Sequence, residues 1–185
     1  EPLFEYSEIN HPVIGSKGMV ASHNALSSEI TAEIMRNGGN AIDAGAALGF
    51  ALAVTLPRAG NVGGGGFMLV YIKEKQEIYY IDYRSSSPLN ANIKDLFNTN
   101  LPKDYKKTDF DKSRFGHKAS AIPGTVAGLL EAHRNFGKLS LKEILEPVIK
   151  QASEGIKVSY DLNKAIESTP QLFNDPESRK IYFDN

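Results

Sequence analysis

The sequence of 185 residues carries 21 basic and 22 acidic side chains, and its formal net charge of −1 provides no field that would draw it onto nucleic acid or an anionic membrane. Hydrophobic residues make up 41% of the chain, which is enough for a globular core in one domain or in part of a larger one. Cysteine is absent from the sequence, which excludes disulfides, thiol nucleophiles and thiolate metal sites.

The first two predicted elements are a strand and an amphipathic helix. Residues 18–23 form a short β-prone run after a turn-forming Gly-Ser-Lys sequence. From residue 25 to residue 37 the apolar side chains recur at helical spacing. Asn37 and the two glycines after it can adopt the left-handed conformation that ends many helices. We therefore expect a strand that leads into a helix.

A second helix is predicted over residues 41–54. Asn40 stands where it can cap the first turn, and Pro57 follows the last one. The segment is low in charge, but glycine and proline interrupt it and it is short for a membrane span, which needs about 20 apolar residues. We expect a buried helix with small side chains that let neighbouring elements approach closely.

A β-hairpin is predicted directly after a glycine-rich loop. The apolar runs at residues 67–72 and 77–83 are typical of strands, and the polar residues 73–76 between them are typical of a turn. Because both runs have apolar residues on both faces of the strand, we expect these strands to be central in a sheet.

The next segment, residues 88–118, is polar with mixed charges and is expected to follow the surface, with one short helix at residues 93–97. Apolar patterns then predict helices over residues 126–136 and 141–153. Ser140 stands at the capping position of the second of these.

Beyond residue 158 the pattern predicts a helix at residues 162–166 and then a polar tail. No linker or internal repeat divides the chain. Residues 1–185 are therefore expected to lack an internal domain boundary.

Four adjacent glycines precede the first hairpin strand: Gly63, Gly64, Gly65 and Gly66. Without Cβ atoms, they allow either close approach of another chain segment or backbone N–H contacts with a ligand. The loop has neither the Lys-Ser/Thr of a phosphate-binding P-loop nor the Gly-x-Gly-x-x-Gly spacing of a dinucleotide site. We expect the four glycines to be buried close to backbone.

Arg84 follows the second hairpin strand and precedes three serines. The planar guanidinium of an arginine can bind a carboxylate through two hydrogen bonds. The alternatives are a salt bridge to Asp82 or a solvated surface arginine.

No metal site, cofactor site or serine triad is predicted. The chain has no Gly-x-Ser-x-Gly elbow, and its histidines lack metal-ligand spacing. These histidines are His11, His23, His117 and His133.

Three long motifs occur together in the chain. They are Gly-Gly-Asn-Ala-Ile-Asp-Ala at residues 38–44, Pro-Arg-Ala-Gly-Asn-Val-Gly-Gly-Gly-Gly-Phe-Met at 57–68 and Pro-Gly-Thr-Val-Ala-Gly at 123–128. Together they resemble the large subunit of γ-glutamyltranspeptidases, over residues 18–155. Three long motifs in register are far more specific than a single glycine run.

The resemblance implies an α+β fold, the αββα sandwich of N-terminal-nucleophile hydrolases, of which this chain supplies the amino-terminal portion of the large subunit. Such enzymes are made as precursors that cut themselves into two subunits. The nucleophile is then a threonine at the amino terminus of the small subunit, whose own amine serves as general base. This chain begins with Glu1, so the resemblance places that threonine elsewhere, and Thr55 and Thr125 are interpreted as structural.

In this family an Arg-Glu-x-Ala-Pro motif after a strand supplies the arginine that binds the α-carboxylate of the γ-glutamyl group. Arg84 matches that position, but Ser85 and Ser87 stand where the family usually has glutamate and alanine. The resemblance therefore implies that Arg84 binds substrate, while a carboxylate that would orient its guanidinium is missing.

The implied function is cleavage of γ-glutamyl amides such as glutathione, with transfer of the γ-glutamyl group to water, amino acids or peptides. The implied partners are the small subunit and the rest of the large subunit, in the periplasm or outside the cell. Family large subunits continue well beyond the length of this chain, so we expect it to be a fragment or a product of further cleavage. The alternatives are an acylase, an enzyme acting on poly-γ-glutamate, or a non-catalytic homologue.

Overall fold

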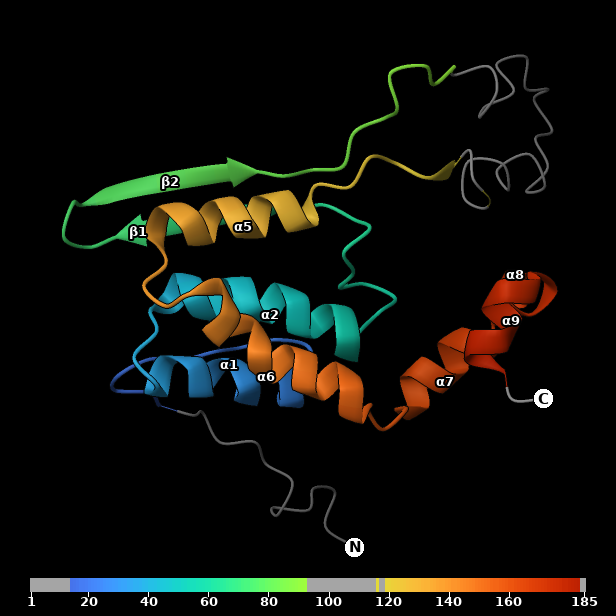
Figure 1. Ribbon diagram of the computed structural model, residues 1–185, viewed down its shortest axis with the longest axis horizontal. Helices are drawn as coiled ribbons and strands as arrows, with labels where there is room; N and C mark the ends of the chain where they lie inside the picture. The colour runs from blue at the N-terminus through green and yellow to red at the C-terminus, as the bar shows by residue number, and fades with distance from the viewer. Residues whose placement is uncertain (1–13, 93–115, 117–118, 184–185) are drawn as a thin grey trace, which may run out of the picture.

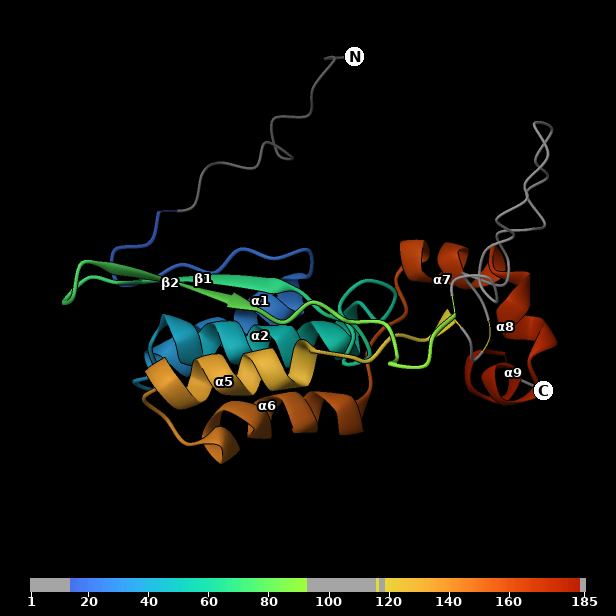
Figure 2. The same ribbon diagram turned by 90° about the horizontal axis from the view of Figure 1, so that it is seen from above.

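The computed structural model describes residues 14–92, 116 and 119–183 (Figure 1). The elements in chain order are α1 (Ala25–Arg36), α2 (Ala41–Thr55), β1 (Phe67–Ile72), β2 (Glu77–Asp82), α5 (Thr125–Phe136), α6 (Leu141–Glu154), α7 (Tyr160–Glu167), α8 (Pro170–Asn174) and α9 (Pro176–Tyr182). Helix α2 contacts α1, α5 and α6, and β2 contacts α5. Figure 2 shows the hairpin along one side of this helical bundle, while α7, α8 and α9 extend away from it.

Helix α2 is the centre of the core, as its composition predicts. Its residues Ala46, Ala47 and Ala51 are buried against side chains of α1 and α6. Gly49 also permits close packing, because a Cβ atom there would lie 2.5 Å from Cδ1 of Leu129 on α5. Small side chains thus let three helices contact α2 at short range.

The predicted helix caps are confirmed. The side chain of Asn40 accepts hydrogen bonds from the backbone N–H groups of Ile42 and Asp43, and the Asp43 carboxylate accepts one from the Asn40 N–H. Ser140 and Glu143 form the same reciprocal arrangement at the start of α6. These contacts satisfy backbone donors that the first turn of a helix leaves unpaired.

The predicted hairpin is confirmed, but its central position in a sheet is wrong. Strands β1 and β2 pair antiparallel from Phe67↔Asp82 to Ile72↔Glu77 and form a two-stranded sheet in the described part of the chain. Helices cover only its inner face, where Tyr79 contacts Phe136 of α5 with ring centroids 4.7 Å apart. The outer face is exposed in the described part of the chain, so the hairpin is apolar on both faces although helices cover one face alone.

The predicted strand at residues 18–23 is also wrong. These residues have no strand assignment and no ladder partner among the described residues. A β-prone composition does not itself supply the neighbouring N–H and C=O groups that a strand requires.

The helices predicted near residues 126–136, 141–153 and 162–166 are confirmed as α5, α6 and α7. The polar tail, for which the sequence pattern predicts no element, contains α8 and α9. Each begins with a proline at its first turn, which is the signal that the apolar pattern alone does not reveal. The helix predicted at residues 93–97 lies outside the described residues. Within the described ranges, no helix has both the length and the apolar character needed to cross a membrane.

Candidate functional site

The glycine-rich loop, the end of β2 and the start of α5 meet at one place. The backbone N–H groups of Gly124 and Thr125 both donate to the carbonyl oxygen of Gly64, at 2.9 and 3.1 Å. Ser86 and Ile122 exchange two backbone hydrogen bonds of 3.1 and 2.8 Å, so the chain leaving β2 runs beside the chain entering α5 (Figure 1). The 57–68 and 123–128 motifs and the Arg84 segment thus converge.

The four glycines of the loop differ in their surroundings. A Cβ atom on Gly65 would lie 2.6 Å from the carbonyl oxygen of Tyr83 and would overlap the backbone nitrogen of Ser85. A Cβ atom on Gly66 would lie 2.8 Å from the Tyr83 ring, whereas at Gly63 and Gly64 it would approach only the side chain of Asn61, at 3.4 and 3.3 Å. Of these four glycines, Gly65 and Gly66 are therefore the two that lie too close to another segment to carry a side chain.

The prediction that all four glycines are buried is wrong. Gly63 and Gly65 are exposed, and Gly64 and Gly66 are half-buried. The loop lies on one side of the chain at residues 83–85, and its other side is open in the described structure. A glycine can thus be required by a neighbour on one side without being buried.

Tyr83 fills the space between the loop and α5. Cβ atoms on Gly124 and Gly128 would overlap the carbonyl oxygen and the ring of Tyr83 respectively. Burial raises the pKa of the Tyr83 phenol, because the phenolate loses hydration there. Tyr83 is not among the site residues predicted from the sequence, although two glycines four residues apart on one helix face were an available signal.

Arg84 is exposed at the end of β2. Its backbone N–H donates to Oδ1 of Asp82 at 3.0 Å, and its guanidinium carbon lies 5.6 Å from the centroid of the Phe67 ring. Within the described residues, no ion pair joins its guanidinium to a carboxylate, so the alternative of a salt bridge to Asp82 is not found. This arrangement leaves the N–H groups of the guanidinium available for an anionic ligand.

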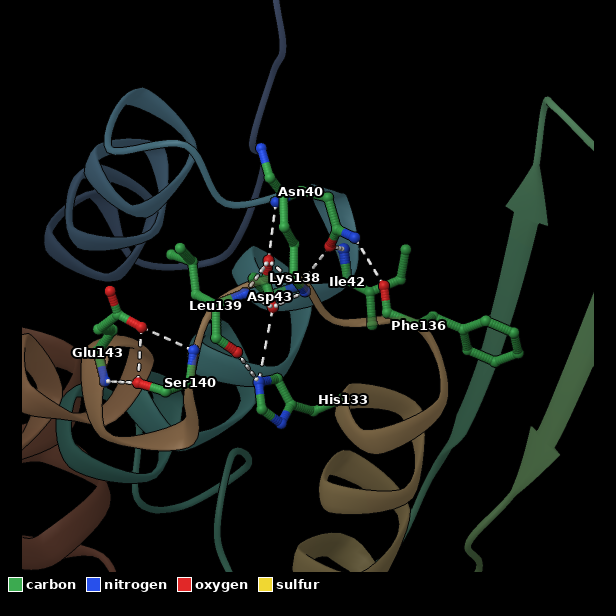
Figure 3. Close-up of polar contacts among 9 residues, drawn as sticks. All are labelled: Asn40, Ile42, Asp43, His133, Phe136, Lys138, Leu139, Ser140 and Glu143. Carbon is green, nitrogen blue, oxygen red and sulfur yellow. Dashed lines mark hydrogen bonds and ion pairs between the residues drawn. The ribbon is translucent and has the colours of Figure 1, made fainter.

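A separate polar network surrounds Asp43, whose side chain is fully buried (Figure 3). Its carboxylate accepts backbone hydrogen bonds from Asn40 at 2.9 Å and from Lys138 at 3.0 Å, with a longer one from Leu139 at 3.3 Å. Nε2 of His133 lies 3.6 Å from Oδ1 of Asp43 and 2.9 Å from the Leu139 carbonyl oxygen.

This network joins the 38–44 motif at the start of α2 to the turn between α5 and α6. Asn40 adds to it by donating from Nδ2 to the carbonyl oxygen of Phe136 at 2.6 Å. Because the carboxylate is enclosed by backbone donors of its own chain, its role is to hold the turn rather than to contact a substrate. This role of Asp43 is not among the predictions from the sequence, although an acidic residue at the third position of a capped helix was a local signal for it.

The other candidates from the sequence lie apart from Arg84. Thr55 is buried in the helical bundle, where its hydroxyl lies 2.7 Å from Oγ of Ser27 and donates to the Ala51 carbonyl oxygen. Thr125 is buried in the first turn of α5. Among the residues that the structure describes, no three or more His, Asp and Glu side chains gather as metal ligands would.

Comparison with known proteins identifies relatives of this arrangement. The profile of the family described as Gamma-glutamyltranspeptidase matches residues 27–185. The chain is 41% identical over 178 residues to the glutathione hydrolase proenzyme of Escherichia coli strain K12, covering 95% of this chain and 30% of that protein. It is 35% identical over 185 residues to the glutathione hydrolase proenzyme of Bacillus subtilis strain 168, and this match covers 100% of this chain and 31% of that protein.

Among solved structures, the γ-glutamyltranspeptidase of Helicobacter pylori superposes on this chain with a TM-score of 0.82 at 34% identity. The superposition covers 94% of this chain and 49% of the Helicobacter pylori chain. The helices and hairpin described above are therefore part of an α+β domain of that kind. The chain spans about 30% of the length of the curated relatives that it matches. From the matched residues and the superposition, we conclude that this chain belongs to the γ-glutamyltranspeptidase family.

Proposed function

We propose that this chain is part of a γ-glutamyltransferase that cleaves γ-glutamyl amides such as glutathione, and that Arg84 binds the α-carboxylate of the donor. One observation carries the proposal. Arg84 is an exposed arginine without an acidic partner in the described structure, at the point where the loop, β2 and α5 converge. Its position after a strand matches the arginine of the family motif.

The proposed reaction has two steps. The hydroxyl of a threonine outside this chain attacks the γ-carbonyl carbon, the C–N bond breaks, and the leaving amine takes the proton. Water or the amine of an amino acid or peptide then attacks the γ-glutamyl ester and releases the threonine. Arg84 makes two charge-assisted hydrogen bonds to the α-carboxylate and so fixes the position of the γ-carbonyl.

The same proposal includes the assembly. The chain is expected to work with the rest of the large subunit and with a small subunit that begins with threonine, after cleavage of a common precursor. We also propose a periplasmic or secreted location, on family resemblance alone. Amino-terminal sequencing of the mature protein tests the assembly, and cell fractionation tests the location.

The test of Arg84 uses the mature enzyme and two donors. One is L-γ-glutamyl-p-nitroanilide, and the other is 4-aminobutanoyl-p-nitroanilide, which lacks only the α-carboxylate. Wild type should strongly prefer the first donor, and Arg84→Ala should lose the preference, because the missing guanidinium served only the carboxylate. Arg134→Ala is the matched control, since Arg134 is an exposed arginine on α5 that pairs with Glu131. An unchanged preference in Arg84→Ala would mean that another residue binds the carboxylate.

Ser85 is the observation that favours a second candidate. Serine replaces the glutamate that the family usually has after the arginine, and this change weakens the case for a γ-glutamyl donor relative to another acyl substrate, poly-γ-glutamate or no catalysis. A companion chain that begins with threonine excludes the non-catalytic reading. A preference for acyl amides without an α-carboxylate would favour the acylase.

A further inference from the structure

Phe67 lies between Tyr80 and Arg84 on the outer face of the hairpin. Its ring is stacked on that of Tyr80, with centroids 5.8 Å apart and planes inclined by 20°. The guanidinium carbon of Arg84 also lies over the Phe67 ring, 5.6 Å from its centroid. Every second residue from Ile78 onward is exposed, so Ile78, Tyr80, Asp82 and Arg84 lie on the same outer face of the hairpin.

Backbone contacts fix the position of Phe67 relative to Arg84. Phe67 is paired with Asp82, and just beyond this pair Gly66 and Tyr83 exchange backbone hydrogen bonds of 3.2 and 3.0 Å. The Tyr83 hydroxyl donates to the Phe67 carbonyl oxygen at 3.4 Å. Asp82 accepts the Arg84 backbone N–H, so this carboxylate also fixes the base of the Arg84 side chain.

We propose that Phe67 is a positioning residue that holds the Arg84 guanidinium for the donor carboxylate. The inference rests on the proposed function and deepens it. A cation over the face of an aromatic ring is attracted by the ring quadrupole, and this contact uses none of the in-plane N–H donors of the guanidinium. The ring therefore restrains the guanidinium while its N–H groups stay free for the carboxylate. It supplies the orientation that the absent glutamate at Ser85 would otherwise provide.

The test compares variants of Phe67 in the mature enzyme with the same two donors. Phe67→Leu should lower kcat/KM for L-γ-glutamyl-p-nitroanilide by about two- to fivefold, mainly through KM, since an exposed cation–π contact has that strength. The 4-aminobutanoyl donor should be unaffected. Phe67→Tyr should retain wild-type values, because it keeps the ring face. Tyr71→Leu is the matched control, because it removes an exposed ring from the same face and strand.

A fluorinated ring separates electrostatics from shape. Replacing Phe67 with 3,4,5-trifluorophenylalanine keeps the ring size and withdraws electron density from its face, so KM for the γ-glutamyl donor should rise as in Phe67→Leu. This variant also carries the test if Phe67→Leu does not fold. Unchanged KM with the fluorinated ring, or an equal effect of Tyr71→Leu, would overturn the positioning role.

The result also separates this inference from the proposed function. If wild type does not prefer the donor with the α-carboxylate, the proposed function fails. If wild type prefers it and Arg84→Ala abolishes the preference, while Phe67→Leu and the fluorinated variant have the wild-type KM for the γ-glutamyl donor, only the role of Phe67 fails.

Discussion

Gly128 of α5 and Tyr83 at the end of β2 are in contact only because residue 128 has no side chain. A Cβ atom there would overlap the Cβ and Cγ atoms of Tyr83. The contact sets the distance between the hairpin and α5. Tyr83 directly precedes Arg84 in the chain. The packing of α5 against Tyr83 therefore affects the position of Arg84, the residue that we propose to bind substrate.

Gly128→Ala should therefore destabilise the protein by about 1–3 kcal/mol, because the helix or the ring has to move. Gly45→Ala on α2 is the matched control, since beyond its chain neighbours and the nearby backbone of α2 no described atom lies within 4 Å of its added Cβ. Alanine in a helix interior should stabilise by about 0.5–1 kcal/mol relative to glycine, so the control should be neutral or stabilising. Denaturant unfolding of both variants measures this. Equal stability of the two would contradict the packing argument.

Tyr83 also predicts a dependence of stability on alkaline pH. Burial raises its pKa in the folded state, so folding favours the protonated phenol. This stabilisation is fully present below the ordinary tyrosine pKa of about 10 and is lost as pH rises through the folded value. The thermal midpoint of wild type should fall more steeply above that pH than the midpoint of Tyr83→Phe. Parallel curves would show that Tyr83 ionises as freely in the folded protein as in the unfolded chain.

Within the glycine-rich loop, Gly65→Ala should reduce soluble yield and maturation, whereas Gly63→Ala should not. An added Cβ at Gly65 meets the backbone of residues 83–85, which cannot yield as a flexible side chain can. At Gly63 the nearest atom is Oδ1 of Asn61, at an ordinary contact distance of 3.4 Å. The fraction of processed protein on a denaturing gel compares the two, and equal processing would contradict this difference between them.

Asp43→Asn should cost about 1.5–3 kcal/mol of stability, because hydrogen bonds to a charged group are lost at a buried site. An asparagine also directs an N–H₂ group toward backbone N–H donors that the carboxylate accepts. Glu33→Gln is the control, since Glu33 forms an exposed pair with Arg36 and such pairs contribute about 0–1 kcal/mol. Urea unfolding compares the two variants. A cost for Asp43→Asn no larger than for the control would show that the network is not needed for stability.

Local chemistry explains which parts of this structure are predictable from sequence. Asn40 and Ser140 act on their own helices, so their caps can be inferred from a few neighbouring residues. The contact of Asp43 with Lys138 spans 95 residues, and no local pattern indicates it. The hairpin is likewise local, but whether other strands flank it depends on segments that its own sequence does not specify. The resemblance identifies Arg84, whereas Phe67 emerges only from its contact with Arg84. The only sequence signal for Tyr83 is indirect, in the two glycines at 124 and 128 whose missing Cβ atoms make room for it.

Arg84→Lys should separate binding from chemistry. Lysine keeps the positive charge but cannot reproduce the two parallel hydrogen bonds of a guanidinium to a carboxylate. If the α-carboxylate is held equally in the ground state and the transition state, KM for γ-glutamyl donors should rise while kcat is kept. Losing a charge-assisted hydrogen bond should lower kcat/KM by about 1.5–3 kcal/mol, roughly 10- to 150-fold. Arg84→Ala should lose more, because the charge is lost as well. Steady-state kinetics of the two variants decide the point: a fall in kcat with unchanged KM would mean that Arg84 acts on the reacting amide and not on the carboxylate.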